Sequence, residues 1–184
     1  MTTQHFDVLI KNGQIVDGSG GKPYQGDIGI NDKTIVAIGQ LKNAKGKTEI
    51  DANNLSVAPG FINMLSWENE SLIVDGRSQG DIRQGVTLEV LGEGFSMGPI
   101  NEAMKKQRQN NQGHMKYDVI WNTLGEYLQH LEDRGVSTNV ASFIGNANMR
   151  LNTTGYNTRA ATDAELQQMK GLIRQAMEEG AMGM

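Results

Sequence analysis

A glutamate flanked by glycines is the side chain in this sequence best placed to do chemistry. Glu93 lies in the segment 92–99, Gly-Glu-Gly-Phe-Ser-Met-Gly-Pro, directly after a β-branched run at 86–91. Glycines let the backbone bend sharply and approach a ligand closely. At the carboxyl end of a strand in a β/α barrel, this carboxylate would lie on the catalytic face. The sequence therefore predicts Glu93 as a candidate functional residue.

Other side chains suited to metal or nucleophilic chemistry are scarce. The chain has no cysteine, so it can form neither a disulfide nor a thiolate metal site. His114 and His130 lie in a polar segment, and Glu126 stands four residues before His130. A single Glu–His pair on one helix face is common at protein surfaces, and no further ligand accompanies it. We expect both histidines to be surface residues.

The elements that must position Glu93 begin after a β-rich segment. Residues 6–57 hold five or six short β-type runs. The pair Asn12-Gly13, between two apolar runs, predicts a hairpin turn because both residues tolerate positive φ. Residues 31–33 separate a second pair of runs. We therefore assign residues 1–57 to a small β-sandwich domain.

Beyond that segment, strands and helices are expected to alternate. The turn Pro59-Gly60 leads into an apolar strand at 61–65, and further strands are predicted at 86–91 and 139–145. Strands joined by right-handed helical crossovers pair in parallel. Residues 58–184 therefore indicate a second domain of the α/β class.

Two amphipathic helices are predicted within this second domain. Apolar residues recur at helical spacing over 121–131, and this helix should end near Gly135. A capping box at 162–165, Thr-Asp-Ala-Glu, begins another helix, which Gly180 ends. Residues 105–113 are polar and predict an exposed helix end followed by a loop.

Several stretches resemble a known family. The run at 58–62, Ala-Pro-Gly-Phe-Ile, is similar to the entry into the first barrel strand of the amidohydrolase superfamily. The run at 85–99 resembles one branch of its D-aminoacylase group, the N-acyl-D-amino-acid deacylases. The short strands within 8–39 also resemble the small β domain at the start of amidohydrolases. The resemblance implies a β-sandwich followed by the first part of a (β/α)8 metal-dependent hydrolase barrel.

The resemblance also implies where a metal would be held. In the superfamily the first barrel strand continues D-x-H-x-H, and its two histidines bind a catalytic metal. This sequence has Asn63, Leu65 and Trp67 at the three matching positions, so Leu65 and Trp67 are vacated metal positions. A cysteine that ligates zinc in better-known members falls on Glu93, and a carboxylate can also coordinate zinc. Glu93 is thus the candidate metal ligand, with zinc as the cofactor of the full-length protein.

Two further positions are candidates for binding substrate or for positioning a loop. Related deacylases read N-V-A-x-x-V-G-H-x-x-x-R, and Arg150 matches their arginine while Asn146 replaces their histidine. Ser96 lies three residues after Glu93 in the glycine-rich segment. The alternatives are a structural ion pair for Arg150 and a hydrogen bond to the turn backbone for Ser96.

The length of the chain is short for the implied barrel. A closed barrel needs eight strand–helix units and typically ~250 residues, whereas about three units and the start of the next strand fit into 58–184. We expect Met184 to be a truncation point. The remaining histidine ligands and the catalytic Asp of the family come from later strands, so we expect no catalytic residue within this chain and no activity from it alone.

The charge and hydropathy of the sequence exclude some classes of binding partner. The formal net charge is −4 and the pI about 5.4, without the basic patch that nucleic-acid binding requires. No apolar run approaches the ~20 residues of a membrane span, and residues 1–6 lack the features of a signal peptide. We expect a small-molecule substrate such as an N-acyl-D-amino acid, no nucleic acid, no membrane, and a cytoplasmic location for the chain as written. The sequence is also compatible with an exported form whose leader has been removed, and with a homo-oligomer.

The sequence is compatible with three functions. The leading one is a hydrolase of non-peptide C–N bonds, an N-acyl-D-amino-acid deacylase that uses a metal-activated water. The second is a non-catalytic relative that has lost the H-x-H metal site. The third is a cyclic-amide hydrolase of the dihydroorotase type, which fits the segment 92–99 less well.

Overall fold

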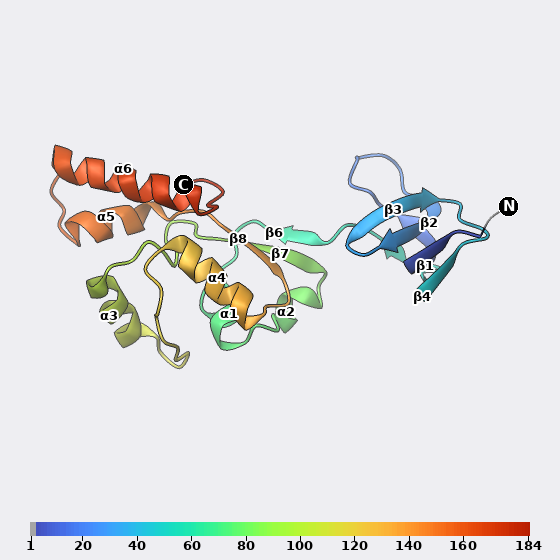
Figure 1. Ribbon diagram of the computed structural model, residues 1–184, viewed down its shortest axis with the longest axis horizontal. Helices are drawn as coiled ribbons and strands as arrows, with labels where there is room; N and C mark the ends of the chain where they lie inside the picture. The colour runs from blue at the N-terminus through green and yellow to red at the C-terminus, as the bar shows by residue number, and fades with distance from the viewer. Residues whose placement is uncertain (1–2) are drawn as a thin grey trace. The chain divides into compact units, whose positions relative to one another are not determined.

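The computed structural model describes residues 3–184 (Figure 1). The chain divides into two compact units, of which the first ends at Pro59 and the second spans Gly60–Met184. Each unit has its own sheet and its own cluster of buried apolar side chains.

The first unit is one mixed sheet of five strands. They are β1 (His5–Ile15), β2 (Tyr24–Asn31), β3 (Thr34–Gly39), β4 (Lys45–Asp51) and β5 (Ser56–Val57). The order is β3-β2-β1-β4, with β5 also paired to β1. The two runs that residues 31–33 separate in the sequence are β2 and β3, which pair antiparallel. Up to Pro59 the described residues form a single sheet, so the predicted second layer of a sandwich is not observed there.

The hairpin predicted at Asn12-Gly13 is wrong. Strand β1 continues through both residues, and its register with β2 shifts between Ile10 and Gly13. Asn12 has a φ of 60°, as a turn residue would. On its other edge β1 pairs with β4 as far as Lys11 and with β5 from Gln14 onward. The Asn-Gly pair therefore forms a bulge at which β1 changes its partner strand.

The second unit contains a parallel sheet. Its strands are β6 (Phe61–Asn63), β7 (Val86–Leu91) and β8 (Asn139–Ser142), in the order β6-β7-β8, and both pairs are parallel. The predicted strand at 86–91 has the bounds of β7, whereas β6 and β8 end earlier than predicted. Parallel pairing is thus confirmed, and closure of a barrel stays a prediction.

Helices connect these strands. Between β6 and β7 lie α1 (Ser71–Val74) and α2 (Gln79–Ile82), and between β7 and β8 lie α3 (Glu102–Asn111) and α4 (Leu124–Arg134). After β8 come α5 (Asn146–Thr154) and α6 (Asp163–Glu178), which pack against each other (Figure 1). Capping boxes at Thr123 and Thr162 begin α4 and α6. No helix within residues 3–184 is long and apolar enough to cross a membrane.

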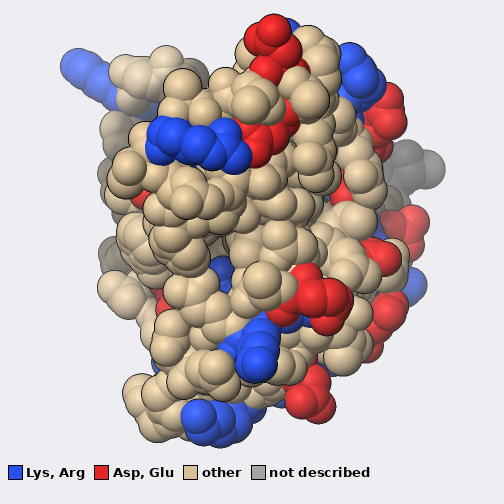
Figure 2. All heavy atoms as spheres, turned by 90° about the vertical axis from the view of Figure 1, so that its left-hand side faces the viewer, with Lys and Arg blue, Asp and Glu red and all other residues tan. Residues whose placement is uncertain are grey.

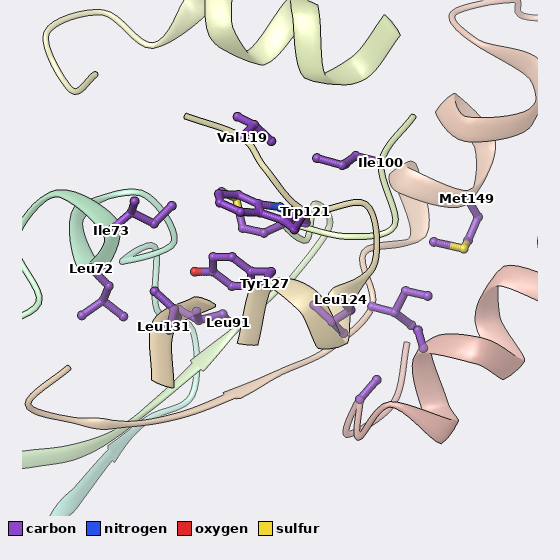
Figure 3. Close-up of a cluster of buried hydrophobic side chains, with 14 residues drawn as sticks. Leu72, Ile73, Leu91, Ile100, Val119, Trp121, Leu124, Tyr127, Leu131 and Met149 are labelled. Carbon is purple, nitrogen blue, oxygen red and sulfur yellow. Dashed lines mark hydrogen bonds between the residues drawn. The ribbon is translucent and has the colours of Figure 1, made fainter. Parts of the chain in front are cut away.

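Two aromatic residues organise the core of the second unit (Figure 3). Trp121 and Tyr127 are 1% and 0% exposed, and their ring centroids are 5.3 Å apart. The Trp121 indole nitrogen donates to the Met97 carbonyl at 2.7 Å, and the Tyr127 hydroxyl donates to the Asn69 carbonyl at 2.9 Å. Both acceptors lie in loops that follow sheet strands. The core therefore fixes these loops in place as well as packing the helices.

Candidate active site

Three loops meet at one edge of the parallel sheet. Because β6, β7 and β8 run in the same direction, the segments after Asn63, Leu91 and Ser142 all begin at their carboxyl ends. A backbone hydrogen bond ties the loop after β7 to the start of α5, because the Ala147 nitrogen, in the first turn of that helix, donates to the Gly94 carbonyl at 3.1 Å. In parallel α/β proteins this edge is where ligands bind.

Gly92 allows the loop after β7 to pass close to the loop after β8. Its φ is +90°, a conformation that L-residues rarely adopt, and a Cβ there would lie 2.1 Å from the Phe143 carbonyl oxygen. Only glycine fits this position without moving the backbone. It sets the direction in which the chain leaves β7, one residue before Glu93.

Glu93 lies at this edge with its side chain exposed to solvent. Its backbone carbonyl accepts a hydrogen bond from the Phe95 nitrogen at 2.7 Å. The alternative of a carboxylate bound to turn amides is not observed within residues 3–184, where no backbone nitrogen donates to the Glu93 side chain. The exposed carboxylate is consistent with a ligand role, which stays a prediction.

The vacated metal positions lie on the segment that begins at β6. Leu65 and Trp67 are 53% and 68% exposed, and the Asn63 side-chain oxygen accepts from the Leu65 nitrogen at 3.4 Å. A leucine and an indole offer no lone pair that binds a metal. Within residues 3–184 no group of three or more His, Cys, Asp or Glu could hold a metal ion. The described residues therefore do not complete a metal site, and Glu93 would supply one ligand only.

Ser96 is buried and joins two loops. Its backbone nitrogen donates to the Asn148 side-chain oxygen at 2.9 Å, and the Asn148 amide donates back to the Ser96 carbonyl at 2.9 Å. The Ser96 hydroxyl donates to the Gly98 carbonyl and accepts from the Gly145 nitrogen at 2.9 Å. The bond to Gly98 is the hydrogen bond to turn backbone that was considered as the alternative for Ser96, and the bond from Gly145 also links the two loops.

The Arg150 side chain also binds backbone carbonyl groups. Its guanidinium donates to the carbonyl oxygens of Asn157 and Arg159, the first at 2.6 Å. These carbonyls belong to the segment that links α5 to α6. The structural ion pair considered as an alternative is not seen for Arg150 within residues 3–184, and the loop-positioning role is the one that this geometry supports.

The two histidines differ in exposure. His114 is exposed, as predicted, whereas His130 is partly buried with its ring centroid 5.2 Å from that of Trp121. His130 therefore belongs to the edge of the core.

A buried carboxyl group was missed by the sequence reasoning. Glu89, on β7, is 0% exposed, and neither of its oxygens has a hydrogen-bond partner among the described residues. Burial raises the pKa of Glu89, and the negative charges of Asp81 and Glu68 raise it further. The only sequence signal was a lone charge within the apolar strand 86–91.

A groove beside the loops was also missed. One hollow of about 220 Å³ lies between α3 and α5, and an adjoining one of about 280 Å³ extends to Trp67. Glu70, Phe95 and Arg108 line both, so we treat them as one feature, the α3–α5 groove. Figure 2 looks onto the side that carries these helices, and a hollow near its middle shows basic atoms inside. The groove joins residues too far apart in sequence for a motif to reveal it.

Comparison with known proteins agrees with this arrangement. No protein-family model matches the chain. N-acyl-D-aspartate deacylase and D-aminoacylase of Alcaligenes xylosoxydans xylosoxydans are each 31% identical to it, over 96% and 98% of this chain and 36% and 37% of their own length. The chain thus spans little more than a third of the relatives that it matches.

Solved structures give the same result. D-aminoacylase, described as defining a subset of amidohydrolases, matches with a TM-score of 0.85 and 27% identity over 97% of this chain and 38% of its own. N-acyl-D-glutamate deacylase from Bordetella bronchiseptica, bound to zinc and a phosphonate that mimics the tetrahedral intermediate, matches with a TM-score of 0.83 and 29% identity over 98% and 38%. The chain therefore has the α/β fold seen in the amidohydrolases of the D-aminoacylase type.

Within that class the match is narrower. Both sequence and structure resemble the D-aminoacylase group over nearly the whole chain, which confirms the resemblance noted in the sequence. The related structures carry metal centres, zinc in the Bordetella enzyme and a binuclear centre in D-aminoacylase.

Proposed function

We propose that the protein is a metal-dependent amide hydrolase that removes the acyl group from N-acyl-D-amino acids. The observation that supports this most directly is the likeness to N-acyl-D-amino-acid deacylases over 96–98% of the chain. On this proposal, Gly60–Met184 contributes the first strands of a (β/α)8 barrel, and the preceding β unit corresponds to the small domain of amidohydrolases.

The roles that we propose for individual side chains follow from the edge of the parallel sheet. Glu93 presents a free carboxylate there and would be one ligand of a zinc site whose other ligands lie outside the described residues. Ser96 joins the loops after β7 and β8, and Arg150 holds the segment between α5 and α6, in each case through hydrogen bonds to backbone. These two residues would act on the substrate only through the loops that they position.

Bound metal and substrate range test this proposal. We expect the full-length protein to release free amine from N-acyl-D-amino acids, and not from their L-enantiomers or from cyclic amides. Glu93→Ala should lose both activity and bound zinc, measured by metal analysis of the purified protein. Glu132→Ala is the matched control, because Glu132 is an exposed glutamate on α4. Retention of zinc and of full activity by Glu93→Ala would refute the ligand role.

A non-catalytic relative is the second candidate. It is favoured by the side chains at Leu65 and Trp67, which stand where the superfamily has its two metal-binding histidines. On this alternative, the zinc-supplied, folded protein would hydrolyse none of the N-acyl-D-amino acids offered. That outcome would replace the enzyme proposal with a binding role for the same loops.

A further inference from the structure

We propose that the α3–α5 groove binds the acyl group of the substrate as an uncharged, mainly apolar chain. This inference rests on the proposed function and adds to it the arm of the substrate that these residues contact. It also predicts a preference for acyl chains longer than acetyl.

The position of the groove is the first argument. Its lining comes from the loops and helices that follow three neighbouring strands: Glu70 after β6, Phe95 and Arg108 after β7, and Leu151 after β8. At its other end it reaches Trp67, one of the vacated metal positions. A chain lying in the groove would therefore extend from the carboxyl edge of the sheet outward between α3 and α5.

The apolar lining is the second argument. Phe95, two residues after Glu93, has a side chain that is 52% exposed. Ile100, Met104 and Leu151 line the same hollow. Pockets for small molecules are typically lined by apolar and aromatic side chains with a few polar groups. Covering an exposed phenylalanine with an alkyl chain removes apolar surface from water, which favours binding.

The charge of the groove is the third argument. Its two charged side chains neutralise each other, because Arg108 Nη1 lies 2.9 Å from Glu70 Oε1 and both are less than a third exposed. The amino-acid arm of the substrate carries a carboxylate, which calls for an unpaired cation or several donors. The groove offers no such cation among its described lining residues. It therefore fits the acyl arm, which carries no charge.

The far end of the groove is polar. The Tyr156 hydroxyl donates to the Gln107 side-chain oxygen at 2.6 Å, which links the segment after α5 to α3. Asn111 lies on the same wall. An apolar chain long enough to reach these groups would leave them without water, so the gain in binding with chain length should end where the chain meets them.

The test is a chain-length series on the full-length protein. The kcat/KM for N-acetyl, N-butanoyl, N-hexanoyl and N-octanoyl derivatives of one D-amino acid should rise with length, by up to about fourfold for each methylene that is buried. N-succinyl, which has the length of butanoyl with a terminal carboxylate, should be a poorer substrate than N-butanoyl. Equal rates across the series, or a preference for N-succinyl, would overturn the inference.

Blocking the groove gives a second readout. Leu151→Trp should lower kcat/KM for the octanoyl substrate by at least about tenfold and change that for the acetyl substrate by less than about twofold. The matched control is Leu166→Trp, because Leu166 is exposed on α6 outside the groove. Met104→Trp replaces Leu151→Trp if the latter fails to fold by circular dichroism. Equal losses on all substrates would contradict the assignment while leaving the hydrolase function intact.

Binding separates failure of this inference from failure of the proposed function. If no substrate is hydrolysed, titration calorimetry with the N-octanoyl and N-acetyl compounds still tests the groove. Tighter binding of the octanoyl compound, weakened by Leu151→Trp, would support the groove without the enzyme. Equal binding, or binding that Leu151→Trp leaves unchanged, would overturn the groove.

Discussion

Glu89 is predicted to destabilise the protein at neutral pH. Its side chain is fully buried on β7, and both oxygens lack hydrogen-bond partners within residues 3–184. A buried polar group left unsatisfied costs about 1–3 kcal/mol, and replacement by an apolar group of similar shape removes that cost. We therefore expect Glu89→Met to raise the free energy of unfolding by about 1–3 kcal/mol at pH 7.

The raised pKa of Glu89 determines how the stability gain from Glu89→Met should vary with pH. Burial raises the pKa of Glu89 above its usual value of 4.5, so the folded state binds the proton more tightly than the unfolded state. The stability linked to this group is fully present below the unfolded pKa and is lost as the pH rises through the folded pKa. The gain from Glu89→Met should therefore be smallest at acidic pH and should grow toward neutral pH.

Urea unfolding followed by circular dichroism at several pH values measures both quantities. Glu132→Met is the control, because Glu132 is an exposed glutamate on α4 and should give no pH-dependent gain. If Glu89→Met loses stability at pH 7, Glu89 makes a stabilising interaction that its burial conceals. A gain that is the same at all pH values would show that the carboxyl does not titrate differently in the two states.

Three further changes test the packing, capping and surface charge of the second unit. Leu131→Ala, in the core, should lower the free energy of unfolding by about 2–5 kcal/mol in urea, and a loss below about 1 kcal/mol would mean that the core repacks. Thr123→Ala removes the capping box that Glu126 completes and should cost about 1 kcal/mol, with a parallel loss of helical circular dichroism; an unchanged spectrum and midpoint would argue against the cap. The guanidinium of Arg159 lowers the pKa of Glu165 to about 2, so the stability that this pair adds is present above the unfolded pKa and is lost as the pH falls toward 2. Glu165→Gln should make acid unfolding less steep in this range, and an identical acid titration would contradict the pairing.

Local signals allowed much of the second unit to be predicted from sequence. The β-branched run at 86–91 gave the bounds of β7, and the Thr-x-x-Glu pattern at Thr162 gave the start of α6. The signal failed where one residue pattern serves two structures, as when the positive φ at Asn12 proved to belong to a bulge. Helix α5 was missed because its asparagine-rich sequence lacks apolar periodicity and its packing against α6 is a tertiary effect.

The candidate site was less predictable for a physical reason. Glu93 could be singled out because glycines flank it in the sequence. The surroundings of Ser96 could not, because its partner Asn148 lies 52 residues away and only the folded chain brings the two together. The α3–α5 groove depends on the same long-range contacts. Local chemistry therefore singled out one candidate side chain, whereas the shape around it required the tertiary structure.

The side chain of Asn148 has a consequence for how substrate preference can change. Its oxygen accepts from the Ser96 nitrogen, and its amide donates to the carbonyls of Ser96 and Pro99. The first turn of α5 and the loop that carries Glu93 are therefore mechanically coupled. On the roles proposed for the groove and for Glu93, a shift of α5 that widens the groove would also move the Glu93 loop, so substrate selectivity and reactivity would change together.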